Sequence, residues 1–409
     1  MLYVPVLLSI LLLLSCAAPG WGDDFSIVPS ITVKEEYNTN ILLAASDMKD
    51  DFITTISPGL EIVDHTGRFD GDLLVRFDRL EYAENQGLSA TNKTYSGRLR
   101  YLVTPLLGIS AEASYVRLPN PALVTGSTGI VTTKSPWDRI TSSLSADYRL
   151  TEKAAAQLSY SYARDHFENA TSSNDTSHNL NAGLEYDLSE YFPSVKGRLN
   201  AGYGHYFSST SRTDNIAGTV GFSRQIDELW SVSADIGPIY VRSTVLVGQL
   251  VPDFLDIDGL EIPVGYHVVT EQRTNSGWGW WGKASLNYGG EYVNGALAYT
   301  RSLSTSTGYN GAAESNAVTL SAQYRLASEL SALFSSSYYT LKSDPSRFSS
   351  QVINQKTLVV SPSLRYEFSK DMAMELSYEY TKVDYPASNT SANRQVISLR
   401  LLFQSPLFH

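Results

Sequence analysis

Two pairs of adjacent acidic and imidazole side chains are the residues whose types could do acid–base chemistry. They are Asp64–His65 and Asp165–His166, and a carboxylate beside a histidine is a pairing that orients a general base. Neighbouring residues of a strand point to opposite faces of its sheet, so neither pair would form a dyad there. The Gly-x-Ser-x-Gly motif of a serine nucleophile is absent from the sequence. A barrel enzyme is therefore the less favoured alternative, and we predict no catalytic residues.

Metal and thiol chemistry have little support in the sequence. The chain has one cysteine, Cys16, and its six histidines are scattered singly without an HxxxH or HExxH pair. A single cysteine excludes an intrachain disulfide and a cysteine-based metal site. We predict no metal site and no cofactor.

A further group of charged residues could act on dissolved ions. Each cation in this group alternates with apolar neighbours, so its side chain would lie on the polar face of a strand. Two interpretations stay open: the cations form ion pairs with acids across neighbouring strands, or they tune the selectivity of a water-filled channel. The candidate lumen residues are Arg98, Arg100, Arg149, Arg198, Lys283, Arg365 and Arg400.

The elements that must position these cations have a period of two. From Ile140 to Leu150, Ile, Leu, Ala and Tyr alternate with Ser, Thr, Asp and Arg, and this pattern recurs from about Phe25 to about Phe403. Each segment has about 10 to 15 residues, which matches a tilted membrane strand better than the five or six residues of most soluble strands. The sequence therefore predicts an all-β protein, a transmembrane antiparallel up-and-down β-barrel of about 18 strands. A pair of soluble β-sandwiches is the alternative, although it would not explain the strand length.

Composition supports the barrel. Charged residues make up 18% of the 409 residues, the chain has 26 Tyr and 4 Met, and its net charge is −11. An acidic chain lacks the clustered cations that bind phosphate backbones, so we expect no nucleic-acid partner. After the N-terminal leader no apolar stretch is long enough for a spanning helix.

The N-terminal leader predicts export. We expect residues 1–22 to be a signal peptide and residues 23–409 to form the barrel, because an apolar core at Leu7–Leu14 is followed by small residues. Cleavage after Gly22 satisfies the small-residue rule. Alternatively, the sequence before Cys16 resembles a bacterial lipobox, and Cys16 would then be lipidated. Both routes take the chain out of the cytoplasm.

The connections between segments alternate between short turns and long loops, which is the layout of an outer-membrane barrel. The longest expected loop runs from Ser243 to Arg273 and is acidic and partly apolar. We expect it to fold inward as a constriction or gate, or to pack over the mouth of the barrel. Its candidate gating residues are Asp253, Asp256, Asp258 and Glu261.

One stretch near the N-terminus resembles a known family. Residues Tyr37-Asn38-Thr39-Asn40-Ile41, followed by Ser57-Pro58-Gly59-Leu60, resemble the opening of the β-barrel porin 2 family. The resemblance implies an outer-membrane barrel of the kind that often accompanies exopolysaccharide systems. The residues themselves suggest a structural role, because Asn38 and Asn40 lie where a strand should end and Pro58 should interrupt a ladder of strand hydrogen bonds.

These observations together predict a porin-like barrel in the outer membrane of a Gram-negative bacterium, giving passage to a solute or a polysaccharide. The expected partners are outer-membrane lipid and lipopolysaccharide and, from the resemblance, components of exopolysaccharide export. The alternative is a non-conducting structural or adhesive surface barrel. Ion conduction across a bilayer would discriminate between the two.

Overall fold

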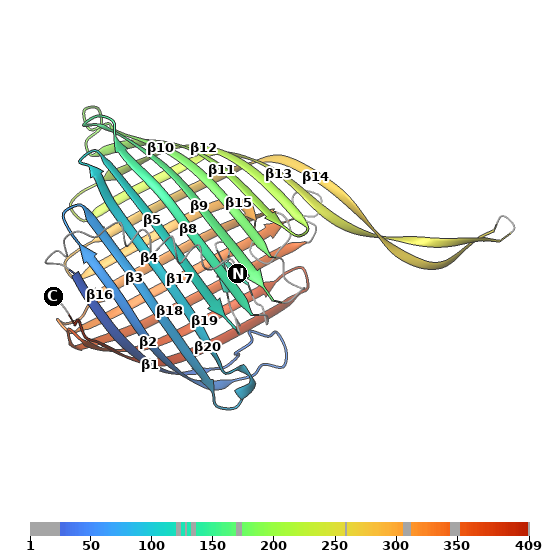
Figure 1. The fold of residues 1–409 in the computed structure, drawn as a ribbon, viewed down its shortest axis with the longest axis horizontal. Helices are drawn as coiled ribbons and strands as arrows, with labels where there is room; N and C mark the ends of the chain where they lie inside the picture. Colours follow the sequence, from blue (N-terminus) through green and yellow to red (C-terminus); the bar gives the residue numbers. More distant parts are fainter. Residues whose placement is uncertain are drawn as a thin grey trace.

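The protein is a closed barrel of eighteen antiparallel strands (Figure 1). The structure, a computed structural model, describes residues 25–119, 124–126, 129–131, 136–168, 174–257, 260–305, 312–343 and 352–407. Each barrel strand pairs with the next along the chain, and β1 closes the barrel by pairing with β20, where Lys34 lies opposite Arg400. The predicted all-β antiparallel barrel of about eighteen strands is confirmed.

The strand boundaries agree with the predicted first and last strands. The barrel strands are β1 (Phe25–Asn38), β2 (Asp51–His65), β3 (Phe69–Tyr82), β4 (Ala90–Thr104), β5 (Leu107–Leu118), β8 (Trp137–Arg149), β9 (Ala154–Phe167), β10 (Asp175–Asp187), β11 (Val195–Ser208), β12 (Ser211–Gln225), β13 (Trp230–Ile257), β14 (Leu260–Gly289), β15 (Val293–Thr305), β16 (Ala312–Arg325), β17 (Leu330–Ser343), β18 (Ile353–Ser369), β19 (Met372–Tyr385) and β20 (Thr390–Gln404). Three short elements lie between them: the 3₁₀ helix η1 (Gln86–Leu88) and the strands β6 (Val124–Gly126) and β7 (Gly129–Val131). No helix in the described part of the chain is long and apolar enough to cross a membrane.

Alternation along each strand separates an apolar exterior from a polar interior. On β9, Leu158 and Tyr160 point outward and are 53% and 41% exposed, whereas Gln157 and Ser159 point to the lumen. The same parity puts Leu184 of β10 and Leu199 of β11 on the outside. An apolar outer belt around a closed set of paired strands leaves no backbone edge exposed to lipid. The chain is therefore placed in the bacterial outer membrane.

The two ends of the barrel differ in their connections. At one end, called here the turn end, β4 and β5 are joined by residues 105–106 and β18 and β19 by residues 370–371. The first and last described strands also begin and end there, because Phe25 lies opposite Asp64. At the other end, the loop end, longer connections such as residues 39–50 and 119–136 join the strands. This asymmetry is the one that the sequence predicted.

The loop of residues 39–50 packs into the loop end of the barrel. Asn40 is fully buried, and its side-chain amide donates hydrogen bonds to the carbonyl oxygens of Ala44 and Asn393 at 2.8 and 2.9 Å. Ile41 is buried against Ile53, an inward-facing residue of β2. The Asn motif of the sequence thus anchors a loop, which confirms its structural interpretation. The interrupted ladder predicted at the nearby proline is also found, since β2 pairs with β3 up to Ile56 and again from Gly59.

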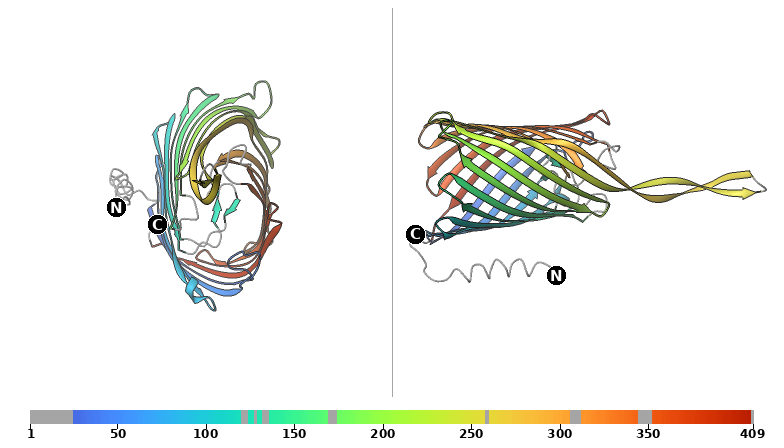
Figure 2. Two further views of the ribbon diagram at one scale, coloured as in Figure 1. Left: turned by 90° about the vertical axis from the view of Figure 1, so that its right-hand side faces the viewer. Right: turned by 90° about the horizontal axis from the view of Figure 1, so that it is seen from above.

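A second connection at the loop end enters the lumen. Residues 119–136 join β5 to β8 and include the antiparallel pair β6 and β7. Looking along the barrel, Figure 2 shows this small hairpin inside the opening, and β7 contacts β17. Because β17 lies on the opposite side of the barrel from β5 and β8, the described hairpin of β6 and β7 lies against the far wall and narrows the lumen.

The segment predicted to be the longest loop is instead a pair of strands. Residues 243–257 of β13 and 260–273 of β14 pair with each other, with one irregularity at Asp253–Phe254. β12 ends opposite Val245, so the remaining ribbon continues without neighbours and projects away from the barrel (Figures 1 and 2). The prediction that this segment folds inward or packs over the mouth is therefore wrong. Continuous cross-strand pairing extends the hairpin outward, and the lumen is narrowed by the hairpin of β6 and β7.

Candidate functional site

One wall of the lumen is formed by β4, β5, β8, β9, β10 and β11 and carries cations. Arg100, Arg149 and Arg198 line one hollow of about 410 Å³ in this wall, together with Asp147 and Glu185. The arginines come from strands that end near short turns, so the hollow lies in the turn-end half of the barrel. We call this surface the basic wall.

A single row across the strands explains which of these charges are paired. Strand pairing places Arg149, Ala155, Glu185, Arg198, Gly221, Asp235 and Lys283 in consecutive register from β8 to β14. Arg198 reaches over Gly221 and donates to Asp235 at 2.8 Å. A Cβ atom at Gly221 would come within 2.0 Å of the Asp235 carboxylate, so glycine leaves room for this ion pair. The carboxylate of Glu185 forms an ion pair with Lys196, also at 2.8 Å.

The residues at the two ends of this row are cations without an ion-pair partner among the described residues. Arg149 faces Ala155, and Lys283 faces an aspartate whose carboxylate is already bound by Arg198. Arg100 lies between Ser110 of β5 and Asp70 of β3, and the Asp70 carboxylate lies 2.7 Å from the imidazole of His65. Among the described residues no carboxylate lies within ion-pair distance of Arg100, Arg149 or Lys283. These guanidinium and ammonium groups therefore face the lumen with their charge uncompensated by a direct partner.

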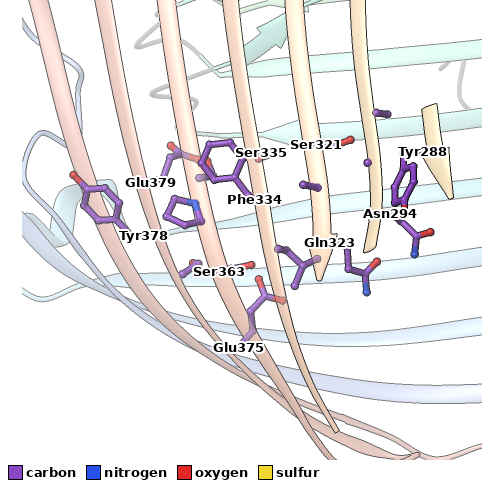
Figure 3. Close-up of a pocket in the computed structure, with 17 residues that line it drawn as sticks. Tyr288, Asn294, Ser321, Gln323, Phe334, Ser335, Ser363, Glu375, Tyr378 and Glu379 are labelled. Atoms are coloured by element: carbon purple, nitrogen blue, oxygen red, sulfur yellow. The ribbon is translucent and has the colours of Figure 1, made fainter. Parts of the chain in front are cut away.

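The opposite wall, formed by β15–β19, carries hydroxyl and amide groups. Its hollow of about 600 Å³ is lined on the lumen side by Ser321, Gln323, Ser335 and Ser363 from neighbouring strands (Figure 3). Two carboxylates stand at its border, and both are neutralised: Arg400 donates to Glu375 at 2.6 Å, and Arg394 to Glu379. We call this surface the serine wall. It offers mainly hydroxyl and amide groups, and in its described part the inward-facing Arg325, at the turn end of β16, has no carboxylate within ion-pair distance.

The two walls face each other across the barrel. In the closed order of eighteen strands, β4–β11 and β15–β19 are separated by about half of the circumference. A solute that passes through the lumen would therefore meet unpaired arginines together with acids such as Glu112 on one side, and mainly hydroxyls with Arg325 on the other. Eighteen strands enclose enough space for water between two such walls.

The seven predicted lumen cations fall into two groups. Arg98, Arg198, Arg365 and Arg400 form ion pairs, with Asp72 at 2.9 Å, Asp235 at 2.8 Å, Glu367 at 3.1 Å and Glu375 at 2.6 Å. The other three are the unpaired Arg100, Arg149 and Lys283 described above. Both sequence-based interpretations thus apply, each to different residues.

The two acid–imidazole pairs are not brought together. His65 lies 2.7 Å from Asp70 across the turn, away from its sequence neighbour. Asp165 is bound by Arg139 at 2.7 Å and by the indole of Trp137 at 2.9 Å. Within the described residues, no group of three or more His, Cys, Asp or Glu side chains could hold a metal ion. The structure therefore shows no acid–base dyad at either pair.

Several predicted residues lie beyond what the structure describes. The signal peptide and Cys16 are outside the described residues, as is Asp258. The backbone of Asp256 and Glu261 belongs to the projecting ribbon, but their side chains are not described. Asp253 lies on the same ribbon, 2.5 Å from His267. The gating role of these acids stays a prediction, whereas their position on a loop is corrected.

Sequence reasoning missed the serine wall because it considered charged residues alone. The signal was present in the alternation: Ser361, Ser363 and Ser377 occupy the polar positions of two predicted strands. What the sequence lacked was the pairing that gathers serines of four strands into one surface.

Comparison with known proteins gives a likeness of fold. No family model matches the chain, and no curated protein matches its sequence. The structure is similar to OccAB4 of Acinetobacter baumannii, with 11% identity, a TM-score of 0.48 and coverage of 95% of this chain and 100% of that one. It is similar to OccK2 (OpdF) of Pseudomonas aeruginosa, with 10% identity, a TM-score of 0.46 and coverage of 96% and 100%. It is also similar to the open form of the ferric-catecholate import receptor Fiu of E. coli K12, with 8% identity, a TM-score of 0.50 and coverage of 95% and 82%. The fold is thus that of outer-membrane barrels, and membership of the β-barrel porin 2 family stays a prediction.

Proposed function

We propose that the protein is a porin-like channel that lets small polar solutes cross the outer membrane, with a modest preference for anions. The observation that supports this most strongly is the pair of polar walls that face each other inside a closed eighteen-strand barrel. If the lumen were closed to solutes, its charged side chains would be expected to pair with one another. Arg100 and Arg149 instead place unpaired charge along its wall. Asp147 in the same hollow offsets part of it, so the preference is modest.

Planar-bilayer conductance of the refolded barrel, residues 23–409, tests the proposal. We expect stepwise conductance from the intact chain. Deletion of residues 124–131, the hairpin inside the lumen, should raise the conductance of each step. Deletion of residues 251–264 is the matched control, because it shortens the projecting ribbon and should leave the steps unchanged. Absence of conductance in all three proteins would overturn the channel function.

A structural or adhesive surface protein is the second candidate. The ribbon of β13 and β14 favours it, since it projects beyond the barrel and exposes large apolar side chains, including Val264, Tyr266 and Val268. This function predicts no conductance, together with a loss of cell-surface attachment when residues 249–269, which include these apolar side chains, are deleted. Attachment that is unchanged by this deletion would contradict it.

Exopolysaccharide export rests on the sequence resemblance alone and stays a proposal. It would be tested by deleting the gene and measuring the polysaccharide released by the cells. Release at the level of the parent strain would exclude a required role in export.

A further inference from the structure

The outer face of β9–β13 has a depression within its apolar belt. Strand pairing puts three small outward-facing residues, Ala182, Ala201 and Gly218, side by side on β10, β11 and β12. They form the floor of a hollow of about 610 Å³, with Leu199 and Val220 on its border. A Cβ atom at Gly218 would meet no other atom within 4 Å. The hollow is therefore open space on the side of the barrel that faces lipid.

Aromatic side chains lie next to this depression in the direction of the loop end. Two residues further along each strand, pairing aligns Tyr160, Leu180, Tyr203, Ile216, Tyr240 and Trp278 in one row. The rings of Tyr240 and Trp278 lie 5.2 Å apart. Tyr and Trp in such a row mark the level of the lipid head groups. The depression thus lies at the level of the acyl chains.

Beyond the aromatic row, the same face carries three outward-facing arginines. Arg164 and Arg242 are exposed, and no carboxylate among the described residues lies within ion-pair distance of either. Arg212 lies 3.7 Å from Asp214. That aspartate already accepts a hydrogen bond from Tyr203 at 2.8 Å and lies 2.6 Å from the imidazole of His205. Asp214, which lies opposite Arg242 in the pairing of β12 with β13, is therefore the carboxylate nearest to Arg212 and Arg242, and it is already engaged.

Other parts of the outer surface have different chemistry. On the outer face near β15–β19, Arg301 and Lys382 are paired with Glu314 at 2.7 Å and Asp384 at 3.2 Å. At the turn end of β12, the outward-facing Arg224 has no carboxylate within ion-pair distance among the described residues. Uncompensated arginines, an aromatic row and an apolar depression are thus stacked on β9–β13.

We propose that this face binds a phosphorylated lipid of the outer leaflet. One acyl chain occupies the depression over Gly218. Arg212 and Arg242, on neighbouring strands, bind one phosphate, and Arg164, three strands and about 14 Å from Arg212, binds a second. Guanidinium groups bind phosphate through paired, charge-assisted hydrogen bonds. From residue 218 to residue 212 the strand extends about 20 Å along its axis, which at a tilt of about 40° is about 15 Å along the membrane normal, so the arginines lie on the loop-end side of the acyl chains and of the aromatic row. The proposal concerns the outside of the barrel and does not depend on the channel function.

Native mass spectrometry of the refolded barrel in detergent tests the phosphate contacts, with bisphosphorylated lipid A and fully dephosphorylated lipid A as probes. We expect the intact barrel to retain the phosphorylated lipid about tenfold more strongly, because charge-assisted contacts are lost with the phosphates. The triple variant Arg164→Gln, Arg212→Gln, Arg242→Gln should bind both probes at the lower level. Arg224→Gln is the matched control and should bind like the intact protein. Equal retention of both probes by the intact barrel would overturn the proposal, as would undiminished binding by the triple variant.

A separate substitution tests the acyl site. Gly218→Leu fills the depression without a clash, and we expect it to weaken the retention of phosphorylated lipid A. Ala113→Leu adds an apolar side chain that is larger than the native one by three carbons, against four for Gly218→Leu, on the outer face of β5, away from the depression, and should have no effect. Unchanged binding by Gly218→Leu would refute the acyl site. Every substituted side chain points outward, so the conductance of each variant should equal that of the intact barrel, which separates this test from that of the channel.

Discussion

The basic wall presents the unpaired Arg100 and Arg149 to the lumen, whereas the serine wall presents mainly hydroxyls, with the unpaired Arg325 at its turn end. Alternation along the strands builds both surfaces, so the difference arises from the residues in register across neighbouring strands. Arg400 on the serine side meets a glutamate on the adjacent strand and is neutralised. Arg149 on the basic side meets an alanine and keeps its charge available to solutes.

The comparison shows that a count of lumen cations overestimates the charge that a solute meets. Arg198 and Arg149 lie in the same row, yet the first is committed to Asp235 and the second has no described carboxylate partner. The paired cation should contribute to stability and the unpaired one to selectivity. Substitutions that separate these two contributions test the comparison directly.

The largest expected effect is the loss of stability when a paired arginine is removed. Arg198→Gln leaves the Asp235 carboxylate, 12% exposed, without its cation, and should lower the free energy of unfolding by about 1–2 kcal/mol. Arg100→Gln removes an unpaired, exposed cation and should change it by less than about 0.5 kcal/mol. Urea unfolding of the barrel in lipid vesicles, followed by tryptophan fluorescence, measures both.

A double variant and a glycine substitution sharpen that result. Adding Asp235→Asn to Arg198→Gln should restore part of the lost stability, because no unpaired charge then remains. Gly221→Ala should also destabilise the barrel, since its Cβ would come within 2.0 Å of the same carboxylate. If Arg198→Gln and Arg100→Gln are equally stable, the division into paired and unpaired cations is wrong.

The strands of this molecule could be predicted from the sequence, but the conformations of the segments that connect them could not. Period-two alternation depends on neighbours along the chain, so it predicted the first and last strands at Phe25 and Phe403. The course of a loop depends on distant contacts. Ile41 is buried against Ile53, and β7 reaches β17 across the barrel, and neither contact has a local signature.

The same limit applies to the candidate site. Parity alone put Arg149 and Arg198 on the lumen side, but their different pairing depends on Gly221 and Ala155 on neighbouring strands. The register between neighbouring strands decides which cation has an ion-pair partner, and one sequence does not give that register. The acidic segment around Asp253 was misassigned as a loop for a related reason, since pairing of two long strands outweighed its loop-like composition.

The second effect concerns ion selectivity. Reversing both unpaired charges with Arg100→Glu and Arg149→Glu should shift the anion-to-cation permeability ratio toward cations by about threefold in 0.1 M salt. Reversal potentials across a bilayer with a salt gradient measure this ratio. The shift should decrease in 1 M salt, where the screening length falls to about 3 Å. A ratio that stays constant would show that these arginines do not face the conducting path.

The smallest expected effect comes from placing charge on the serine wall. Ser335→Lys and Ser363→Lys together add two cations where the structure has hydroxyls, and should move the permeability ratio toward anions by about twofold. Two added charges change the lumen by half as much as two reversed ones, so the shift should be smaller than that of the arginine variants. Ser335→Gln with Ser363→Gln keeps a polar side chain without charge and serves as the control. If the lysine variant shifts selectivity as strongly as the arginine reversal, ions pass nearer to the serine wall, and the basic wall is not the surface that determines selectivity.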